Sequence, residues 1–198
     1  MQSASVTGRN AIPPPVIRPA VSTDVAALVA LINGAYRGES SRRGWTTEDH
    51  LLGGQRTDAL EVAELLGAAG NALLVLRGND GIEGCVLLQA KGAATCYLGM
   101  LTVRPDLQSR GLGRQLLTAA EHHARTQLGA SRIEMTVIDV RRELIAWYER
   151  RGYRNSGEIR AFPYDDERFG LPKRPDLRFV VLRRQLGESI PTAEDTDP

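Results

Sequence analysis

The chain has 198 residues, 42% of them hydrophobic, which suffices for one sizeable core and is typical of a folded globular domain. Its 25 Lys and Arg residues balance 24 Asp and Glu residues, so the formal net charge is +1 and no overall field attracts nucleic acid or an anionic membrane. No stretch has the roughly 20 apolar residues of a membrane helix, and residues 1–15 lack the core of a signal peptide. We therefore expect a cytoplasmic protein that recognises a small ligand locally, with no nucleic acid and no membrane as partner.

Composition separates one domain from two tails. Residues 1–15 contain three consecutive prolines and no apolar run, and residues 187–198 are polar and acidic. Such segments bury too little apolar surface to offset the entropy of ordering. We expect both tails to be disordered and residues 16–186 to form a single domain.

Apolar periodicity and turn residues predict the elements of this domain. Val25, Leu28, Leu31 and Ile32 recur at helical spacing, whereas Gly78-Asn-Asp-Gly81 is a strong turn signal between two apolar runs. In chain order, we predict a strand at 16–18, a helix capped by Ser22 or Thr23, a polar loop at 36–45, a short helix capped by Thr46 or Thr47, a helix at 58–68, hairpin strands at 72–77 and 82–88, a strand at 96–103, a helix at 113–128, a strand at 133–137, a helix at 141–151, and closing strands at 153–161 and 178–182 around a loop at 162–176.

The cysteines and histidines show no metal-binding pattern. Cys85 and Cys96 lie in apolar runs without a Cys-x-x-Cys spacing, and His50, His122 and His123 have no ligand spacing with other metal-binding residues. We expect two buried reduced thiols and no metal.

The most informative segment runs from Tyr97 to Arg114, where a strand, a glycine-containing turn and an amphipathic helix follow one another. Gly111 and Gly113 allow the backbone N–H groups to approach a phosphate, and the helix dipole adds about half a positive charge. The segment matches neither a P-loop, which needs Gly-Lys-Ser/Thr, nor a dinucleotide fingerprint, which needs a glycine where Leu116 stands. Coenzyme A remains as a ligand with a pyrophosphate.

Two motifs resemble a known family. Leu101-Thr-Val-Arg-Pro105 followed by Gln108-Ser-Arg-Gly-Leu-Gly-Arg-Gln-Leu-Leu117 resembles the acetyl-CoA motif of the GNAT superfamily of N-acetyltransferases, and Leu144-Ile-Ala-Trp-Tyr-Glu-Arg-Arg-Gly-Tyr153 resembles its second signature. The resemblance implies a mixed α/β fold, a mostly antiparallel sheet of about seven strands flanked by helices, in which a splayed strand pair forms the acetyl-CoA notch. It implies cofactor binding by Leu101, Thr102, Val103, Gln108, Ser109, Arg110, Gly111, Leu112, Gly113 and Arg114.

The resemblance also implies catalytic roles. The backbone N–H of Val103 would polarise the thioester carbonyl, and Tyr148 would protonate the departing thiolate. A base for the acceptor amine is sought in Tyr97 or Glu134, although water is an alternative acceptor of that proton. Many family members have an asparagine where Arg141 stands, so Arg141 is expected either to lose that contact with pantetheine or to reach a phosphate instead.

In this family the acceptor enters between the loop that follows the first helix, here 36–45, and the loop before the last strand, here 162–174. Aromatic side chains of both loops would line its site, and Glu39 and Asp165 would attract a cationic amine. Arg37, Arg42 and Arg43 permit the contrary interpretation, an acceptor that bears a carboxylate. The residues expected to bind the acceptor are Tyr36, Glu39, Trp45, Phe162 and Asp165.

The leading hypothesis is an acetyl-CoA-dependent N-acetyltransferase that acts on a primary amine of a small molecule or peptide by direct attack in a ternary complex. The alternatives are a protein N-terminal acetyltransferase and an acyl-CoA-binding sensor domain without turnover. We also expect a homodimer.

Overall fold

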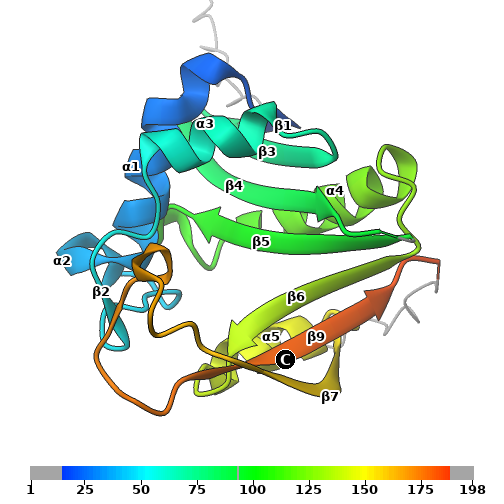
Figure 1. Cartoon of the computed structure of the whole chain (residues 1–198). Helices are drawn as coiled ribbons and strands as arrows, with labels where there is room; N and C mark the ends of the chain where they lie inside the picture. Colours follow the sequence, from blue (N-terminus) through cyan, green and yellow to red (C-terminus); the bar gives the residue numbers. More distant parts are fainter. Residues whose placement is uncertain (1–14, 93, 188–198) are drawn as a thin grey trace, which may run out of the picture.

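Seven strands form one twisted sheet in the order β1-β3-β4-β5-β6-β9-β7 (Figure 1). The computed structural model describes residues 15–92 and 94–187, so the predicted tails, apart from Pro15 and Gly187, lie outside the described residues. Among the described strands, β5 and β6 pair in parallel and all other neighbours pair antiparallel. This architecture confirms the predicted fold class. The strands are β1 Val16–Pro19, β3 Asn71–Gly78, β4 Gly81–Ala90, β5 Thr95–Val103, β6 Arg132–Ile138, β7 Arg154–Ala161 and β9 Arg178–Gln185.

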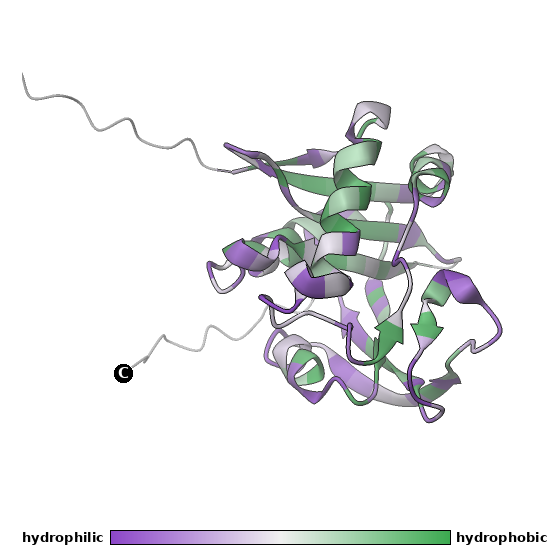
Figure 2. Cartoon of the chain, turned by 90° about the vertical axis from the view of Figure 1, so that its left-hand side faces the viewer, coloured by the Kyte–Doolittle hydropathy of each residue, from purple (hydrophilic) through white to green (hydrophobic). Residues whose placement is uncertain are grey.

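Helices cover both faces of the sheet, and strand alternation explains how. In β3, Leu73 and Val75 pack on one face with α1 and α3, whereas Leu74 and Leu76 pack on the other with α4. Hydrophobic colouring accordingly concentrates on the central strands and on the helices against them (Figure 2). The helices are α1 Val25–Tyr36, α2 Gly38–Ser41, α3 Ala59–Gly67, α4 Leu112–Thr126 and α5 Arg142–Glu149, with 3₁₀ turns at Ser22–Asp24, Pro105–Leu107 and Glu167–Phe169.

A β-bulge in β5 opens the middle of the sheet. Cys85 pairs with Thr102 and Leu87 with Gly99, so Met100 and Leu101 together oppose one residue of β4. Met100 adopts a left-handed backbone, with φ of 49°. The strand then pairs with β6 only through residues 95–97, and the two strands diverge beyond that point (Figure 1). The expected splayed pair is present.

Some local predictions were wrong at the ends of helices. The helix expected after Thr46 or Thr47 is a turn, in which Leu51 and Leu52 donate to the Glu48 carbonyl. The first helix is capped by neither Ser22 nor Thr23. Instead, the Asp24 carboxylate accepts a hydrogen bond from the Val21 N–H at 2.9 Å and forms an ion pair with Arg18 at 2.7 Å.

A small ladder joins the segment after the 46–51 turn to the expected acceptor loop at 162–174. β2, Leu52–Gly53, pairs antiparallel with β8, Leu171–Pro172, and the Lys173 N–H donates to the Leu51 carbonyl at 2.8 Å. Sequence patterns indicated no strand at either place. The ladder lies over a small apolar cluster of Leu51, Leu52, Ile138, Phe162 and Leu177.

Cys85 and Cys96 are buried free thiols, as predicted. Within residues 15–92 and 94–187, no group of three or more His, Cys, Asp or Glu side chains could hold a metal ion. No helix in these same ranges is both long and apolar enough to cross a bilayer.

Candidate active site

A cavity of about 300 Å³ lies between the end of β5, the start of α4 and α5. Seven of the ten expected cofactor residues line it: Leu101, Val103, Gln108, Ser109, Gly111, Gly113 and Arg114. The other three do not. Thr102 is buried and its hydroxyl donates to the Met100 carbonyl, Arg110 is exposed, and Leu112 packs against the core. The motif residues therefore surround a cavity, which is the candidate cofactor site.

The turn before α4 has the backbone of an anion site. Ser109 and Gly111 both have positive φ, 66° and 78°, and successive N–H groups in such turns form concave anion-binding surfaces. The first N–H groups of α4 have no acceptor within the helix and carry its positive dipole end. Of the described residues, no acidic side chain lines the cavity. The site therefore fits a pyrophosphate.

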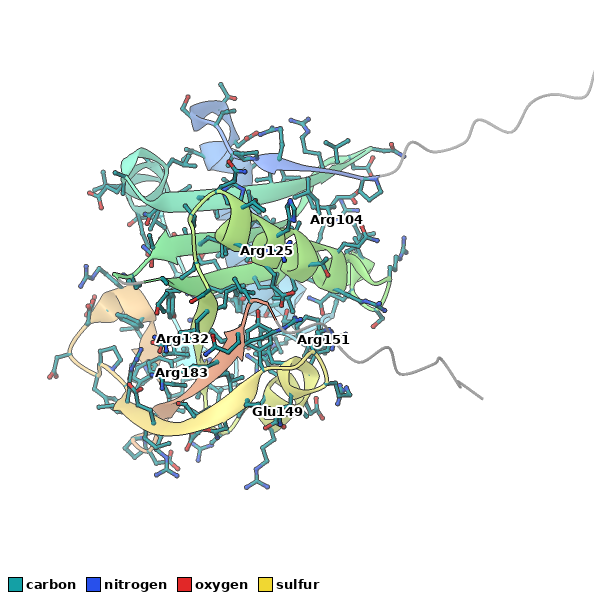
Figure 3. All side chains as sticks on the ribbon, turned by 90° about the vertical axis from the view of Figure 1, so that its right-hand side faces the viewer. Arg104, Arg125, Arg132, Glu149, Arg151 and Arg183 are labelled. Atoms are coloured by element: carbon teal, nitrogen blue, oxygen red, sulfur yellow. The ribbon has the colours of Figure 1, made fainter. Side chains whose placement is uncertain are left out.

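Arg151 lines this cavity but was not among the expected cofactor residues. Its guanidinium stacks 3.7 Å from the centre of the Trp147 ring, and it donates to the Trp147 carbonyl at 2.7 Å. Burial, and then the charges of Arg150 and Arg114, lower the pKa of this guanidinium. Figure 3 shows Arg151 between α4 and α5. The available signal was the four-residue helical spacing from Trp147.

The backbone of Leu101 and Val103 faces the opening between β5 and β6. The Arg104 N–H donates to Glu83 of β4 at 2.8 Å, and successive strand N–H groups point to opposite sides, so the Val103 N–H points away from β4. The Leu101 carbonyl already accepts from the Tyr36 hydroxyl at 2.9 Å. The N–H of Val103 is therefore directed away from β4, toward the side on which β5 and β6 diverge.

Gln108 joins the cofactor turn to the loop after α1. Its side-chain amide donates to the Val103 carbonyl at 3.0 Å and to the Thr46 hydroxyl at 2.8 Å, and its carbonyl accepts the Trp45 N–H at 3.0 Å. Trp45 then faces Trp147 across the cavity, with ring centroids 6.1 Å apart. Trp45 thus lies on the cofactor side, whereas the sequence predicted it in the acceptor wall.

A second cavity, about 120 Å³, lies on the other side of Tyr148, between β5 and β6. It shares Leu101, Leu144 and Tyr148 with the first cavity, which we call the cofactor cavity because residues of the expected cofactor motif line it. It also borders a larger hollow of about 570 Å³. The residues that line both are Arg56, Tyr97, Gly99, Met100, Thr136, Phe169 and Phe179. We call the smaller one the acceptor cavity and the larger one the vestibule.

Tyr148 therefore lies where the cofactor and acceptor cavities meet. Its side chain is 94% buried in edge contacts with Trp147 and Tyr153, and its hydroxyl has no hydrogen-bond partner among the residues that the structure describes. Burial, and then the neighbouring Tyr36, raise the pKa of the Tyr148 phenol far above its usual range. The group is a neutral hydroxyl that can donate a proton or a hydrogen bond.

The predicted acceptor residues separate into two groups. Tyr36 and Phe162 line the acceptor cavity, and burial raises the pKa of Tyr36 to about 12. Glu39, on α2, and Asp165, in the 162–177 loop, are exposed and line neither the acceptor cavity nor the vestibule. The structure does not bring these two acids to the site.

The two predicted bases also differ in position. Tyr97 lines the acceptor cavity and the vestibule, and its hydroxyl is 2.8 Å from the Thr136 hydroxyl. Glu134 lines neither and is held by Arg160 at 2.7 Å and Arg183 at 2.8 Å. Burial alone would raise the pKa of the Glu134 carboxyl, but the hydrogen bonds from these arginines lower it. Arg183, labelled in Figure 3, is opposite Glu134 in the β6–β9 ladder.

Arg141, at the position of the family asparagine, does not line the cofactor cavity. It is buried and pairs with Glu48 at 3.3 Å, and Glu48 also pairs with buried Arg37 at 2.8 Å. In place of the short helix expected after Thr46 or Thr47, the Glu48 carboxylate is held by residues of two other segments, and its N–H donates to the Tyr36 carbonyl at 3.1 Å. Arg37 and Glu48 line the acceptor cavity.

Comparison with known proteins agrees with this geometry. The model of the acetyltransferase (GNAT) family matches residues 36–153. That range is more than half of the chain and includes both the turn at 108–113 and Tyr148. The chain therefore belongs to the GNAT acetyltransferase family. No curated protein sequence matches the chain.

Solved structures share the fold at low identity. They include yncA of Salmonella typhimurium, a candidate acetyltransferase solved with acetyl-CoA (TM-score 0.65, 20% identity, 93% of this chain and 100% of that one). Another is the ribosomal-protein-S18-alanine N-acetyltransferase of Escherichia coli (TM-score 0.64, 17% identity, 90% of this chain and 97% of that one). A third is a candidate phosphinothricin N-acetyltransferase (TM-score 0.64, 17% identity, 88% of this chain and 99% of that one). These likenesses show the fold alone.

Proposed function

We propose that the protein binds acetyl-CoA in the cofactor cavity and transfers the acetyl group to a primary amine in the acceptor cavity. The observation that carries the proposal is the position of Tyr148, which lines both cavities. When bound, acetyl-CoA supplies an acetyl group activated as a thioester. A shared wall lets the amine and the thioester approach from opposite sides without a covalent enzyme intermediate.

The residues of the chain have separate tasks in this reaction. The turn at 108–113, Arg114 and Arg151 hold the pyrophosphate by N–H groups and positive charge. The Val103 N–H donates to the carbonyl oxygen as negative charge develops there. As the new C–N bond forms and the C–S bond breaks, the Tyr148 hydroxyl donates its proton to sulfur.

The amine must lose a proton in the same reaction. Of the two predicted bases, Tyr97 is the one that lines the acceptor cavity. Water is the alternative acceptor of that proton. Glu134 is a poor base because two arginines stabilise its ionised form and so reduce its affinity for a proton.

The test is release of free thiol from acetyl-CoA in the presence of a panel of primary amines, followed by mass measurement of the product. We expect amine-dependent thiol release and a product heavier by one acetyl group. Tight acetyl-CoA binding without release for any amine would favour the sensor domain, and absence of binding would reject the proposal. The named neighbours supply the first panel, because their names include phosphinothricin, ribosomal-protein alanine and spermidine N-acetyltransferases.

A further inference from the structure

The charges around the acceptor cavity and vestibule favour an anion. The acids that line them are Glu48, held by Arg37 and Arg141, and Glu61, which accepts the Thr57 hydroxyl at 2.7 Å. Neither carboxylate is without a partner. Glu61 has a neutral hydroxyl as its partner and lies at the vestibule, whereas Glu48 is neutralised by two arginines. In the acceptor cavity, a cationic acceptor would therefore find no unpaired acid in the lining that the structure describes.

Most of the cations in the same lining are also paired. Arg160 binds Glu134 and Glu158, each at 2.7 Å, and Arg168 binds Asp166 at 2.5 Å. Arg56 and Lys91 have no acidic group within ion-pair distance among residues 15–92 and 94–187. Arg56 is the one of these two that also lines the acceptor cavity.

Arg56 is held in place by its backbone. Its N–H donates to the Asn33 side-chain carbonyl at 2.7 Å, and Asn33 also binds both backbone groups of Thr57, at 2.8 and 3.2 Å. The Arg56 guanidinium carbon lies 5.8 Å from the centre of the Tyr36 ring, and the Tyr36 hydroxyl donates to Leu101 of β5. Hydrogen bonds and a ring thus connect this unpaired cation to the strand that faces the thioester.

The outer side of Arg56 is a poor place for an anion. A surface groove that Arg56 also borders is lined by four acids, Asp58, Glu61, Glu64 and Glu167, against one further cation, Arg168, which is paired with Asp166. Coulombic repulsion from these carboxylates disfavours an anion there and leaves the inner cavities as the favourable side.

We propose that the acceptor amine carries a carboxylate and that Arg56 binds this carboxylate at the junction of the acceptor cavity and the vestibule. The inference rests on the proposed function and names its substrate class. A guanidinium presents a planar fork that matches a carboxylate, and a fork whose backbone is already fixed loses less entropy on binding. The combined cavity suits a small molecule of amino-acid size or somewhat larger.

The test compares common L-amino acids with their α-carboxamides as acceptors, by thiol release from acetyl-CoA. Replacing the carboxylate by an amide lowers the pKa of the amine, so a larger fraction of the amide is in the reactive neutral form near neutral pH. A lower KM for the acid therefore reports binding of the carboxylate. Short peptides whose first residue is Asp or Glu form a third arm, which distinguishes a side-chain carboxylate from that of a free amino acid. We expect a lower KM for carboxylate-bearing acceptors than for amides.

Arg56→Gln should raise KM for the preferred carboxylate acceptor about 10- to 100-fold, the effect of one lost charge-assisted hydrogen bond, and should leave KM for acetyl-CoA and for the matched amide unchanged. Arg168→Gln is the control, since Arg168 lines the vestibule but is paired with Asp166. Equal KM values for acids and amides, or equal effects of the two substitutions, would overturn the inference.

A binding measurement separates this inference from the proposed function. The same acids and amides are titrated by NMR into the full chain saturated with coenzyme A. Acid-selective binding that Arg56→Gln abolishes would support the carboxylate site even if no thiol is released, in which case the proposed function alone fails. Unselective binding would overturn the carboxylate site whatever the turnover.

Discussion

The two sides of Tyr148 are built in different ways. The cofactor cavity is formed mainly by one continuous segment, 101–114, and by one face of α5. The acceptor cavity collects residues from α1, the loops on either side of β2, the diverging strands β5 and β6, and the 162–177 loop. Acetyl-CoA is common to the family, whereas acceptors differ. Because the two cavities are built from different segments, residues on the acceptor side can vary without disturbing the turn at 108–113.

The largest effect is expected where the two sides meet. Tyr148→Phe removes one hydroxyl and keeps the ring contacts with Trp147 and Tyr153. We expect turnover to fall by about 10²- to 10⁴-fold, the usual contribution of general acid catalysis, with acetyl-CoA affinity nearly unchanged. Single-turnover acetyl transfer measures the chemical step, and wild-type rates at that step would remove Tyr148 from the mechanism.

The second effect should be confined to the cofactor side. A side chain at Gly113 would project into the cavity beside Trp147, whose ring lies 3.6 Å from the position of an added Cβ. Gly113→Leu should weaken acetyl-CoA binding about 100-fold by calorimetry, because the leucine and the cofactor compete for the same space. Gly67→Leu, at the end of α3 with no atom within 4 Å of an added Cβ, is the matched control. Equal affinities for the two variants would contradict the location of the site.

A smaller effect is expected from the link between the two sides. An added Cβ at Gly44 would lie 2.7 Å from the Gln108 side-chain oxygen, so Gly44→Ala should displace Gln108 and reproduce Gln108→Ala. Both variants should bind acetyl-CoA about 10-fold more weakly, because the hydrogen bonds that hold Trp45 over the cavity are lost.

Tryptophan fluorescence can follow this change, since both tryptophans of the chain line the cofactor cavity. Gly34→Ala, where an added Cβ has its nearest contact at an ordinary 3.6 Å, should behave like the wild type. A wild-type response in Gln108→Ala would show that the loop is held without this side chain.

The pH profile should show the smallest change. Burial raises the pKa of Tyr148, and a general acid is active only while protonated, so its titration cannot reduce activity below that raised pKa. Single-turnover rates should not fall between pH ~8 and pH ~10, where an ordinary tyrosine with pKa near 10 would begin to lose its proton. A decline in this range that disappears in Tyr148→Phe would contradict a buried, protonated acid.

The same contrast explains what could be predicted from the sequence. The strand, turn and helix around Gly111 are determined by adjacent residues, and the fold, the splay and the position of Tyr148 followed from two local motifs. A short helix was expected after Thr46 or Thr47, but Glu48 in that segment is held by Arg37 and Arg141, which are 11 and 93 residues away. Local propensity contains no information on such distant partners.

Side-chain direction in the loops was equally inaccessible. Trp45 belongs to an acceptor loop in the chain and to the cofactor cavity in space, because Gln108, 63 residues later, holds its backbone. The contribution of Arg56 depends on Asn33 in another element. The loops that the family resemblance places at the acceptor suggested acids such as Glu39 and Asp165 there, whereas the described lining presents an unpaired arginine.

The most direct test of the central claim is a crystal structure of the wild-type protein with acetyl-CoA. We predict the pyrophosphate at the turn 108–113, with Arg114 and Arg151 beside it, the thioester carbonyl within reach of the Val103 N–H, and the sulfur within hydrogen-bonding distance of the Tyr148 hydroxyl. The methyl end of the acetyl group should face the acceptor cavity. A cofactor bound elsewhere, or one whose thioester points away from both Tyr148 and the acceptor cavity, would contradict the assignment of the two cavities.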